Sequence, residues 1–122
     1  MKNVFYINLD KREDRRKECE ELFNKMGCDY ERFSAIEQKN GAYGCMLSHL
    51  KLLEHAREKQ LEYIIIFEDD IEVIDIDELK LNLKKFLEKE IDFDMLKIGA
   101  NAFPPYKDIN DGFVELNFSL TT

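Results

Sequence analysis

Residues 63–70 read Tyr-Ile-Ile-Ile-Phe-Glu-Asp-Asp, an unbroken apolar run that ends abruptly in three acids. A similar run, Val4-Phe5-Tyr6-Ile7, lies near the start of the chain and ends at Asn8. Short continuous runs of β-branched and aromatic residues are typical of strands buried on both faces, the pattern of parallel sheets. We therefore expect strands over residues 4–7 and 63–67 that belong to one parallel sheet.

Outside these two runs the pattern changes to helical spacing. Apolar residues recur at i, i+3, i+4 and i+7 from Cys19 to Met26, and Gly27 follows, which predicts a helix over residues 13–26. The other expected elements are a weaker strand at 30–36, helices at 43–60 and 77–90, and strands at 94–98 and 113–118. Strands that alternate with amphipathic helices predict an α/β fold with a mainly parallel sheet.

The buried faces of the later helices are predicted from the same spacing. The helix at 43–60 is expected to bury Met46, Leu50 and Leu53, and His55 is expected on its surface. For the helix at 77–90 the expected buried residues are Leu79, Leu83, Phe86 and Leu87.

Composition limits the classes of protein that the chain can belong to. With 122 residues the chain predicts a single domain, and a net charge of −8 argues against a nucleic-acid partner, which needs a cationic surface. Cys19, Cys28 and Cys45 include no C-x-x-C pair, so reduced, packed thiols in a reducing compartment are expected. No apolar run approaches the length of a signal peptide or transmembrane helix, which favours the cytoplasm.

Polar residues follow the first predicted strand, at the edge of the sheet where ligands bind in open α/β folds. They include Asn8, Asp10, Arg12, Arg15 and Arg16. Arginines at the first turn of a helix, next to its free N–H groups, suit a phosphate group. The alternative is a solvated helix face on which these arginines pair with neighbouring acids.

The acids at 68–70 follow the second apolar strand at the same expected edge. If the backbone stays extended, Glu68 and Asp70 point the same way and Asp69 points the opposite way. Mg²⁺ or Mn²⁺ is usually held by one or two carboxylates together with substrate phosphates, so Glu68 and Asp70 are candidate metal ligands. The alternative is a solvated acidic turn.

A third cluster lies at the start of the helix at 43–60. Gly41 and Gly44 allow close approach of another backbone segment, and Ser48 and His49 follow within the next turn. His49 is expected to face inward, either as a site residue or as a histidine satisfied within the core.

In this order, these clusters resemble glycosyltransferase family 25, which includes lipooligosaccharide (lipopolysaccharide) biosynthesis glycosyltransferases and collagen galactosyltransferases. The resemblance rests on residues 5–10 with the arginines that follow, on Gly44-Cys45-Met46-Leu47-Ser48-His49-Leu50, on Ile66-Phe67-Glu68-Asp69-Asp70, and on Phe93-Asp94-Met95-Leu96-Lys97-Ile98-Gly99. It implies a GT-A-like, Rossmann-type α/β sandwich. It also implies metal-assisted transfer of a sugar, commonly galactose, from a UDP-sugar to a glycan or hydroxylysine hydroxyl, with inversion.

The resemblance also implies roles for individual residues. The nucleotide-sugar-binding residues would be Asn8, Arg12, Arg15, Ser48, His49 and Asp69. Glu68 and Asp70, within the Glu-Asp-Asp motif, would hold Mn²⁺ or Mg²⁺ against the diphosphate. No catalytic base is assigned, because Asp69, Asp70 and His49 are all conceivable.

One feature departs from the family pattern. Family members continue past this point with a His-x-Tyr-like motif and further helices, so we expect a donor-binding portion that is incomplete at its C-terminus. An uncovered sheet edge would then favour self-association, and a location at the inner face of a membrane fits the family.

Two alternatives remain at this point. The first is an inactive truncated domain that serves as a nucleotide-sugar-binding or protein-interaction module. The second is a receiver-like phosphoacceptor domain, which is disfavoured because such domains carry their acidic pair after the first strand, where this chain has Asn8-Leu9-Asp10.

Overall fold

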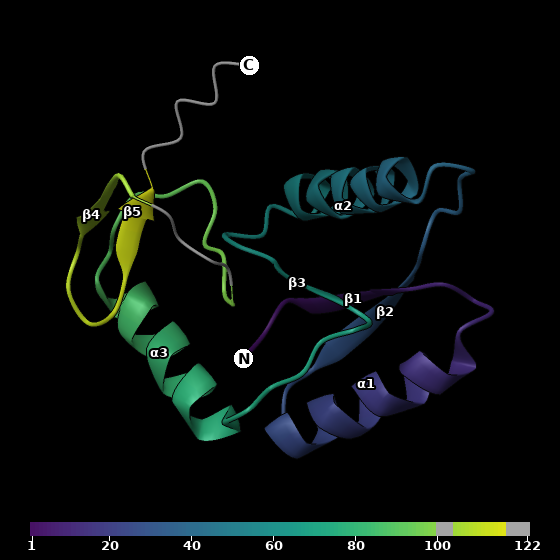
Figure 1. Cartoon of the computed structure of the whole chain (residues 1–122), viewed down its shortest axis with the longest axis horizontal. Helices are drawn as coiled ribbons and strands as arrows, with labels where there is room; N and C mark the ends of the chain where they lie inside the picture. Colours follow the sequence, from purple (N-terminus) through teal and green to yellow (C-terminus); the bar gives the residue numbers. More distant parts are fainter. Residues whose placement is uncertain (100–103, 117–122) are drawn as a thin grey trace. The chain divides into compact units, whose positions relative to one another are not determined.

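The computed structural model describes residues 1–99 and 104–116 (Figure 1). The elements in chain order are β1 (Val4–Asn8), α1 (Glu13–Met26), β2 (Tyr30–Ser34), α2 (Gly41–Glu58), β3 (Ile65–Glu68), α3 (Ile76–Glu88), β4 (Tyr106–Asp108) and β5 (Val114–Leu116). The chain divides into two compact units, Met1–Ile76 and Asp77–Thr122. A single domain over residues 1–122 therefore stays a prediction.

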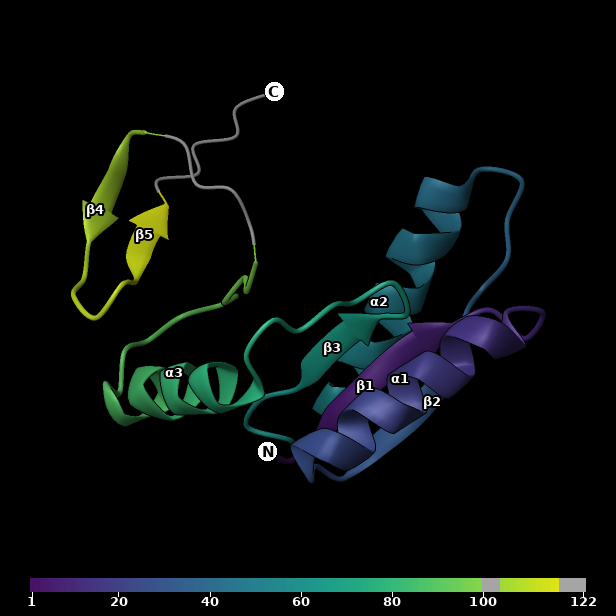
Figure 2. The ribbon, with the colours of Figure 1, turned by 60° about the horizontal axis from the view of Figure 1, so that its bottom comes forward.

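The first unit is built on a parallel sheet with the strand order β2-β1-β3 (Figure 2). All five residues of β1 are buried, because β1 is the central strand and both of its faces are covered. The edge strands β2 and β3 are only partly buried. The predicted parallel sheet and the α/β class are confirmed, whereas self-association through a sheet edge stays a prediction.

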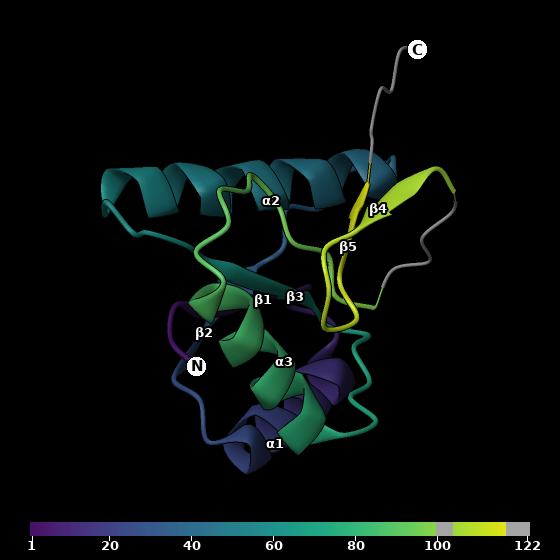
Figure 3. The same ribbon diagram turned by 90° about the vertical axis from the view of Figure 1, so that its left-hand side faces the viewer.

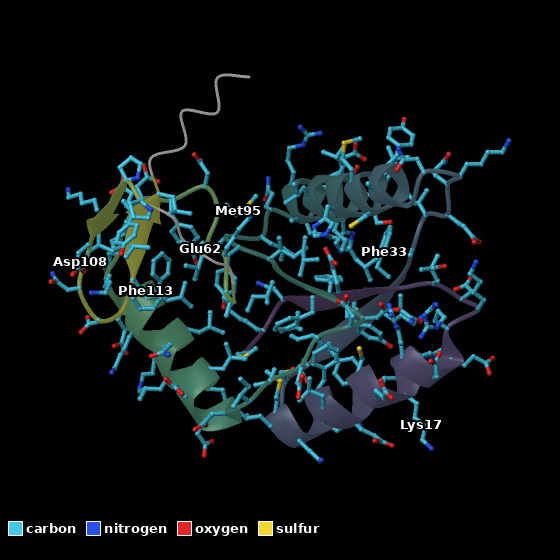
Figure 4. All side chains as sticks on the ribbon, in the orientation of Figure 1. Lys17, Phe33, Glu62, Met95, Asp108 and Phe113 are labelled. Atoms are coloured by element: carbon cyan, nitrogen blue, oxygen red, sulfur yellow. The ribbon has the colours of Figure 1, made fainter. Side chains whose placement is uncertain are left out.

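Helices α1 and α2 lie on opposite faces of this sheet (Figures 1 and 3). On the α1 face, the ring of Phe23 lies 5.3 Å from that of Tyr6 and 5.4 Å from that of Phe67. On the α2 face, Phe5 and Ile7 form a buried cluster with Leu52, and further apolar side chains that include Phe33 pack against it (Figure 4). The strands thus supply apolar residues to both faces, as their continuous apolar runs predict.

Helix α1 spans the residues predicted for it, and its C-terminus explains why it stops there. Gly27 has a φ of +66°, in the left-handed region that favours glycine. Its N–H donates to the carbonyl of Asn24, and the N–H of Cys28 donates to the carbonyl of Phe23. These two bonds form a Schellman motif, which satisfies carbonyls that the end of the helix would otherwise leave unpaired.

The predicted buried face of α2 is wrong. Met46, Leu50 and Leu53 are between 46% and 49% exposed. The buried residues of α2 are instead Gly44, Ser48, Leu52 and Ala56. Gly44 and Ser48 near the start of the helix pack closely against the backbone of Ile36, which precedes the helix. This close packing determines which face of α2 is buried.

The close packing is clearest at Gly44. A Cβ added at Gly44 would lie 2.5 Å from the carbonyl oxygen of Ile36, so no larger residue fits there. The predicted close approach is confirmed at Gly44 but not at Gly41, where an added Cβ would meet nothing within 4 Å. One turn later, the buried hydroxyl of Ser48 accepts a hydrogen bond from the N–H of Ile36 at 2.9 Å.

The second unit contains α3 and an antiparallel hairpin of β4 and β5. Leu83 and Phe86 of α3 are buried, as predicted, and the ring of Phe86 lies 4.8 Å from that of Phe93 and 5.1 Å from that of Phe113. Leu79 is half-buried, whereas Leu87 is 42% exposed, so its predicted burial is wrong.

The strands predicted beyond α3 are only partly correct. The strand predicted at 94–98 is absent, since a strand needs a paired neighbour and no described strand pairs with this segment. Of the strand predicted at 113–118, residues 114–116 form β5, and the last two residues lie outside the described part. Strand β4 was not predicted from the sequence.

Candidate functional site

The carboxyl ends of β1 and β3 lie side by side, since Ile7 is in register with Glu68. The strand order reverses at β1, because the chain passes from β1 to β2 on one side and returns to β3 on the other. Ligands of open α/β sheets bind at such a switch point, outside the carboxyl ends of the strands. The polar residues that follow β1 and β3 therefore meet at the position where a ligand is expected.

Asn8 and Asp69 join the two strand ends directly. The buried side-chain amide of Asn8 donates to Oδ2 of Asp69 at 2.8 Å and to the carbonyl of Arg12 at 3.1 Å. Arg15 Nη1, from the first turn of α1, donates to the other oxygen, Oδ1 of Asp69, at 3.1 Å. Each oxygen of Asp69 already accepts a hydrogen bond, so this carboxylate holds the site together and is poorly placed to act as a base.

Two interpretations were open for the arginines after β1, a phosphate site and a solvated helix face, and the structure shows a different arrangement for different arginines. Arg12 Nε and Nη2 donate to Asp14 at 3.0 Å and 2.9 Å, and Arg16 donates to Glu20. Arg12 and Arg16 thus pair with neighbouring acids, as on a solvated helix face. Arg15 instead contacts Asp69 at the strand ends, where a ligand phosphate could meet it.

Arg32 on β2 is a member of this cluster that the sequence analysis missed. Its Nε donates to the side-chain oxygen of Asn8 at 3.0 Å, and its Nη2 donates to Asp10 at 2.6 Å. The hydrogen bond from Arg32, followed by one from the hydroxyl of Ser34, lowers the pKa of the Asp10 carboxyl. A charged residue in the middle of a predicted strand was the signal that could have identified Arg32.

On the opposite face of the sheet, Glu68 meets two residues of α2. Its Oε1 lies 3.3 Å from His49 Nε2 and accepts a hydrogen bond from the thiol of Cys45 at 3.6 Å. Burial raises the pKa of the Cys45 thiol, and the negative charge of Glu68 adds to the effect. Cys45 is a second residue that the sequence analysis missed, although its spacing of four from His49 places both on one helix face.

Asp70 and the two histidines differ from one another in their surroundings. Asp70 is exposed and makes no hydrogen bond or ion pair with any described residue. His49 is neither buried in the core nor fully exposed, since 36% of its side chain remains accessible beside Glu68. His55, expected on the surface, packs edge-on against the ring of Phe5 at 5.5 Å.

An open cavity of about 330 Å³ lies over this edge of the sheet. Its walls include Cys45 and Ser48 of α2, Glu68 and Asp69 at the end of β3, and the segment 35–39 that follows β2. The hydroxyl of Ser48 donates to the carbonyl of Gly44 at 2.9 Å and is held by Ile36, so it shapes the wall. This volume lies at the lower end of the range that ligand pockets occupy.

The structure defines a Rossmann-like α/β fold with an open cavity at the carboxyl edge of its parallel sheet. The family model described as "Glycosyltransferase family 25 (LPS biosynthesis protein)" matches residues 1–43 and 39–114. The chain belongs to glycosyltransferase family 25. This membership confirms the resemblance that the sequence motifs carry.

Relatives from distant organisms agree with this membership. A Haemophilus influenzae protein named "Putative glycosyltransferase" is 32% identical over 123 residues, which covers 80% of this chain and 42% of that protein. A "Glycosyltransferase 25 family member" of Drosophila melanogaster is 30% identical over 96 residues, which covers 56% of this chain and 16% of that protein. The chain thus spans less than half the length of these relatives. Among its described residues, no helix has the length and apolar character needed to cross a membrane.

Proposed function

We propose that this chain forms the donor-binding part of a glycosyltransferase that takes a sugar, galactose in the first instance, from a UDP-sugar. The acceptor is a hydroxyl of a glycan or of a hydroxylysine-type residue, and the transfer proceeds with inversion. The observation that carries the proposal is the convergence of Asn8, Arg15 and Asp69 with Glu68 at one edge of the sheet, where Asp70 follows in the turn after β3. Family membership supplies the class of reaction.

Charge supports a diphosphate donor at this edge. The leaving group of a UDP-sugar is a nucleoside diphosphate, and catalysis requires cationic groups where its negative charge develops. Arg15 is positioned by Asp69 and keeps 37% of its side chain accessible, so its remaining N–H groups are available to a phosphate oxygen. Arg12 is engaged by Asp14 and would have to exchange that partner to take part.

The acidic residues fit a divalent cation by their chemistry. Asp69 is neutralised by Arg15, but neither Glu68 nor Asp70 has a lysine or arginine partner among the described residues. Carboxylates without a cationic partner are the ligands that Mg²⁺ and Mn²⁺ prefer beside substrate phosphates. A cation held by Glu68 and Asp70 would supply charge neutralisation for the departing diphosphate.

Deprotonation of the acceptor hydroxyl requires a base within about 3 Å of it in the productive complex. Because both oxygens of Asp69 accept hydrogen bonds, His49 and Asp70 are the remaining candidates of the three considered. Both side chains are accessible, and we propose no assignment between them.

Thermal unfolding with Mn²⁺ and UDP, added separately and together, tests donor binding. A ligand at about 100 times its Kd stabilises a protein by about 2.7 kcal/mol, which corresponds to a Tm rise of several degrees. We expect the largest rise with Mn²⁺ and UDP together, and a much smaller one in the Glu68→Ala/Asp70→Ala double variant. An equal response in that variant would overturn the metal assignment.

A matched control removes two exposed acids elsewhere, as Glu72→Ala/Asp92→Ala, and should respond like the unmodified chain. Release of sugar from a panel of UDP-sugars then distinguishes the two remaining functions. Turnover of any donor supports the transferase, whereas tight UDP binding without turnover supports the nucleotide-sugar-binding module. The absence of any Tm response to UDP would contradict both.

A further inference from the structure

Three potential metal ligands of different chemistry meet on the α2 side of the sheet. Cys45 and His49 are four residues apart on α2 and therefore share one face of the helix. Glu68 reaches the same place from the end of β3. One ligand atom from each of the three lies within 4.8 Å of the other two.

The separations of Glu68 Oε1 from the other two ligand atoms suit a tetrahedral metal site. Zn²⁺ binds sulfur at about 2.3 Å and imidazole nitrogen or carboxylate oxygen at about 2.0–2.2 Å. In a tetrahedron these lengths place sulfur and oxygen about 3.5 Å apart, and nitrogen and oxygen about 3.4 Å apart. The observed separations are 3.6 Å from Cys45 Sγ to Glu68 Oε1 and 3.3 Å from His49 Nε2 to the same oxygen.

The kinds of ligand determine which metals fit. Thiolate and imidazole favour Zn²⁺ and other borderline transition metals, whereas Mg²⁺ and Mn²⁺ favour carboxylate, carbonyl and water oxygens. We propose that Cys45, His49 and Glu68 bind a borderline transition-metal ion such as Zn²⁺. When the ion binds, the thiol of Cys45 releases its proton to solvent and coordinates as the thiolate.

The part of the chain that the structure describes supplies three ligands to this cluster, which leaves the fourth position of a tetrahedral ion open. Cys45 and Glu68 both line the cavity, and that position is therefore accessible to water or to an oxygen atom of a bound ligand. Catalytic zinc sites share this arrangement, whereas structural sites are closed by a fourth protein ligand.

This inference goes beyond the proposed sugar transfer and does not rest on it. Glu68 is then a ligand in two proposed metal sites, since it is also a proposed ligand of Mn²⁺ or Mg²⁺ together with Asp70. A transition-metal ion held by Cys45 and His49 would then compete with the hard cation for this carboxylate. Asp70 belongs only to the proposed hard-cation site.

Titration of the reduced full chain with Co²⁺ alone, without nucleotide, tests the site. We expect one equivalent to bind with a thiolate-to-cobalt charge-transfer band in the near ultraviolet and with visible bands of a four-coordinate ion. Zn²⁺ should abolish these bands stoichiometrically, because zinc binds such ligands more tightly than cobalt does. A 100-fold excess of Mg²⁺ should leave them unchanged.

Variants of the three ligands and matched controls separate this site from adventitious binding. Cys45→Ser should abolish the charge-transfer band, and His49→Ala and Glu68→Gln should each weaken Co²⁺ binding at least tenfold. The controls Cys19→Ala and His55→Gln alter the same residue types outside the cluster and should bind Co²⁺ normally. Far-UV circular dichroism establishes that each variant is folded, and His49→Ala, at a half-exposed position, provides a second test if Cys45→Ser does not fold.

Two results would overturn the proposal. One is the absence of a charge-transfer band in the unmodified chain, and the other is a band that Cys45→Ser and His49→Ala leave unchanged. Failure of the proposed function is a separate result, because it would appear as a missing Tm response to Mn²⁺ with UDP while Co²⁺ binding persisted. The Asp70→Ala variant should likewise retain Co²⁺ binding.

Discussion

The substitution Asn8→Ala tests whether the ends of β1 and β3 are joined through one buried amide. Only 1% of Asn8 is exposed, and its side chain makes three hydrogen bonds, to the Arg12 carbonyl, to Asp69 and from Arg32. Alanine would remove all three bonds and leave a carboxylate and a guanidinium each without one partner. We therefore expect a large loss of stability from a single amide.

The size of the expected stability loss follows from whether each hydrogen-bond partner of Asn8 is neutral or charged. A hydrogen bond between neutral groups contributes about 1 kcal/mol and one to a charged group about 2 kcal/mol, so the three bonds together contribute about 5 kcal/mol. Water can replace part of this, because the side chains of Asp69 and Arg32 remain 13% and 20% accessible. We expect the free energy of unfolding to fall by about 3 kcal/mol, a large fraction of the stability of a small domain.

Equilibrium unfolding in urea, followed by far-UV circular dichroism, measures this loss, and the m value should be unchanged. The matched control is Asn24→Ala on α1, where the side chain accepts one exposed 3.3 Å bond from the hydroxyl of Tyr30. That variant should stay within about 0.5 kcal/mol of the unmodified chain. A loss below about 1 kcal/mol for Asn8→Ala would refute the reasoning, because the amide would then contribute no more than a surface group.

Three further predictions concern the backbone near two helix ends and one buried thiol. Gly44→Ala should lower the free energy of unfolding in urea by about 1–3 kcal/mol, because its Cβ would meet the Ile36 carbonyl. The control Gly41→Ala, whose Cβ would lie in open space, should raise it by up to about 1 kcal/mol. Equal effects of the two substitutions would contradict the close approach at Gly44. Gly27→Ala should cost about 1–2 kcal/mol by the same measurement, since a Cβ is strained at a φ of +66°, and a neutral result would contradict the left-handed cap. Burial, with the charge of the nearby acids, raises the pKa of Cys19 from 9.0 to about 11. The unfolded chain therefore loses this proton at a lower pH than the folded chain does. The free energy of unfolding should fall as the pH rises from 9.0 to about 11, by at most about 1.4 kcal/mol per pH unit. Urea unfolding across this range should show the fall in the unmodified chain and a shallower one in Cys19→Ala; parallel curves would contradict it.

Much of the first unit could be predicted from sequence because its signals are local. The continuous apolar runs identify β1 and β3, and the spacing from Cys19 to Met26 with Gly27 after it predicts the observed bounds of α1. Burial on both faces of a strand requires apolar residues at every position, and a helix packed on one side requires them every three to four residues. These requirements leave the same pattern in any sequence that meets them.

The buried face of α2 shows where such reasoning fails. Its most apolar face, with Met46, Leu50 and Leu53, is exposed, whereas the face of Gly44 and Ser48 is buried. Hydrophobic periodicity assumes that the largest apolar side chains face the core. Here the close approach of the 35–38 segment requires small residues, and that requirement comes from a neighbour outside the helix.

The candidate site was likewise predicted only in part from the sequence. The sequence identifies the residues that follow β1 and β3 but does not show which carboxylate meets which partner. Asp69 binds Asn8 and Arg15 on one side of the sheet, and Glu68 meets Cys45 and His49 on the other. Alternation along the chain predicts that these two acids point apart, but it cannot name their partners, which lie between 19 and 61 residues away in the sequence.

By itself, therefore, the amino-acid sequence determined the class of fold, strands β1 and β3, the extent of α1 and the edge of the sheet at which polar residues gather. Each of these depends on interactions between near neighbours or on burial averaged over a segment. Only the tertiary structure decided the rotation of α2, the place of Arg32 beside Asn8, and the meeting of Cys45 and His49 with Glu68. Those depend on the register of Ile7 with Glu68 and on how distant segments pack, which no local pattern encodes.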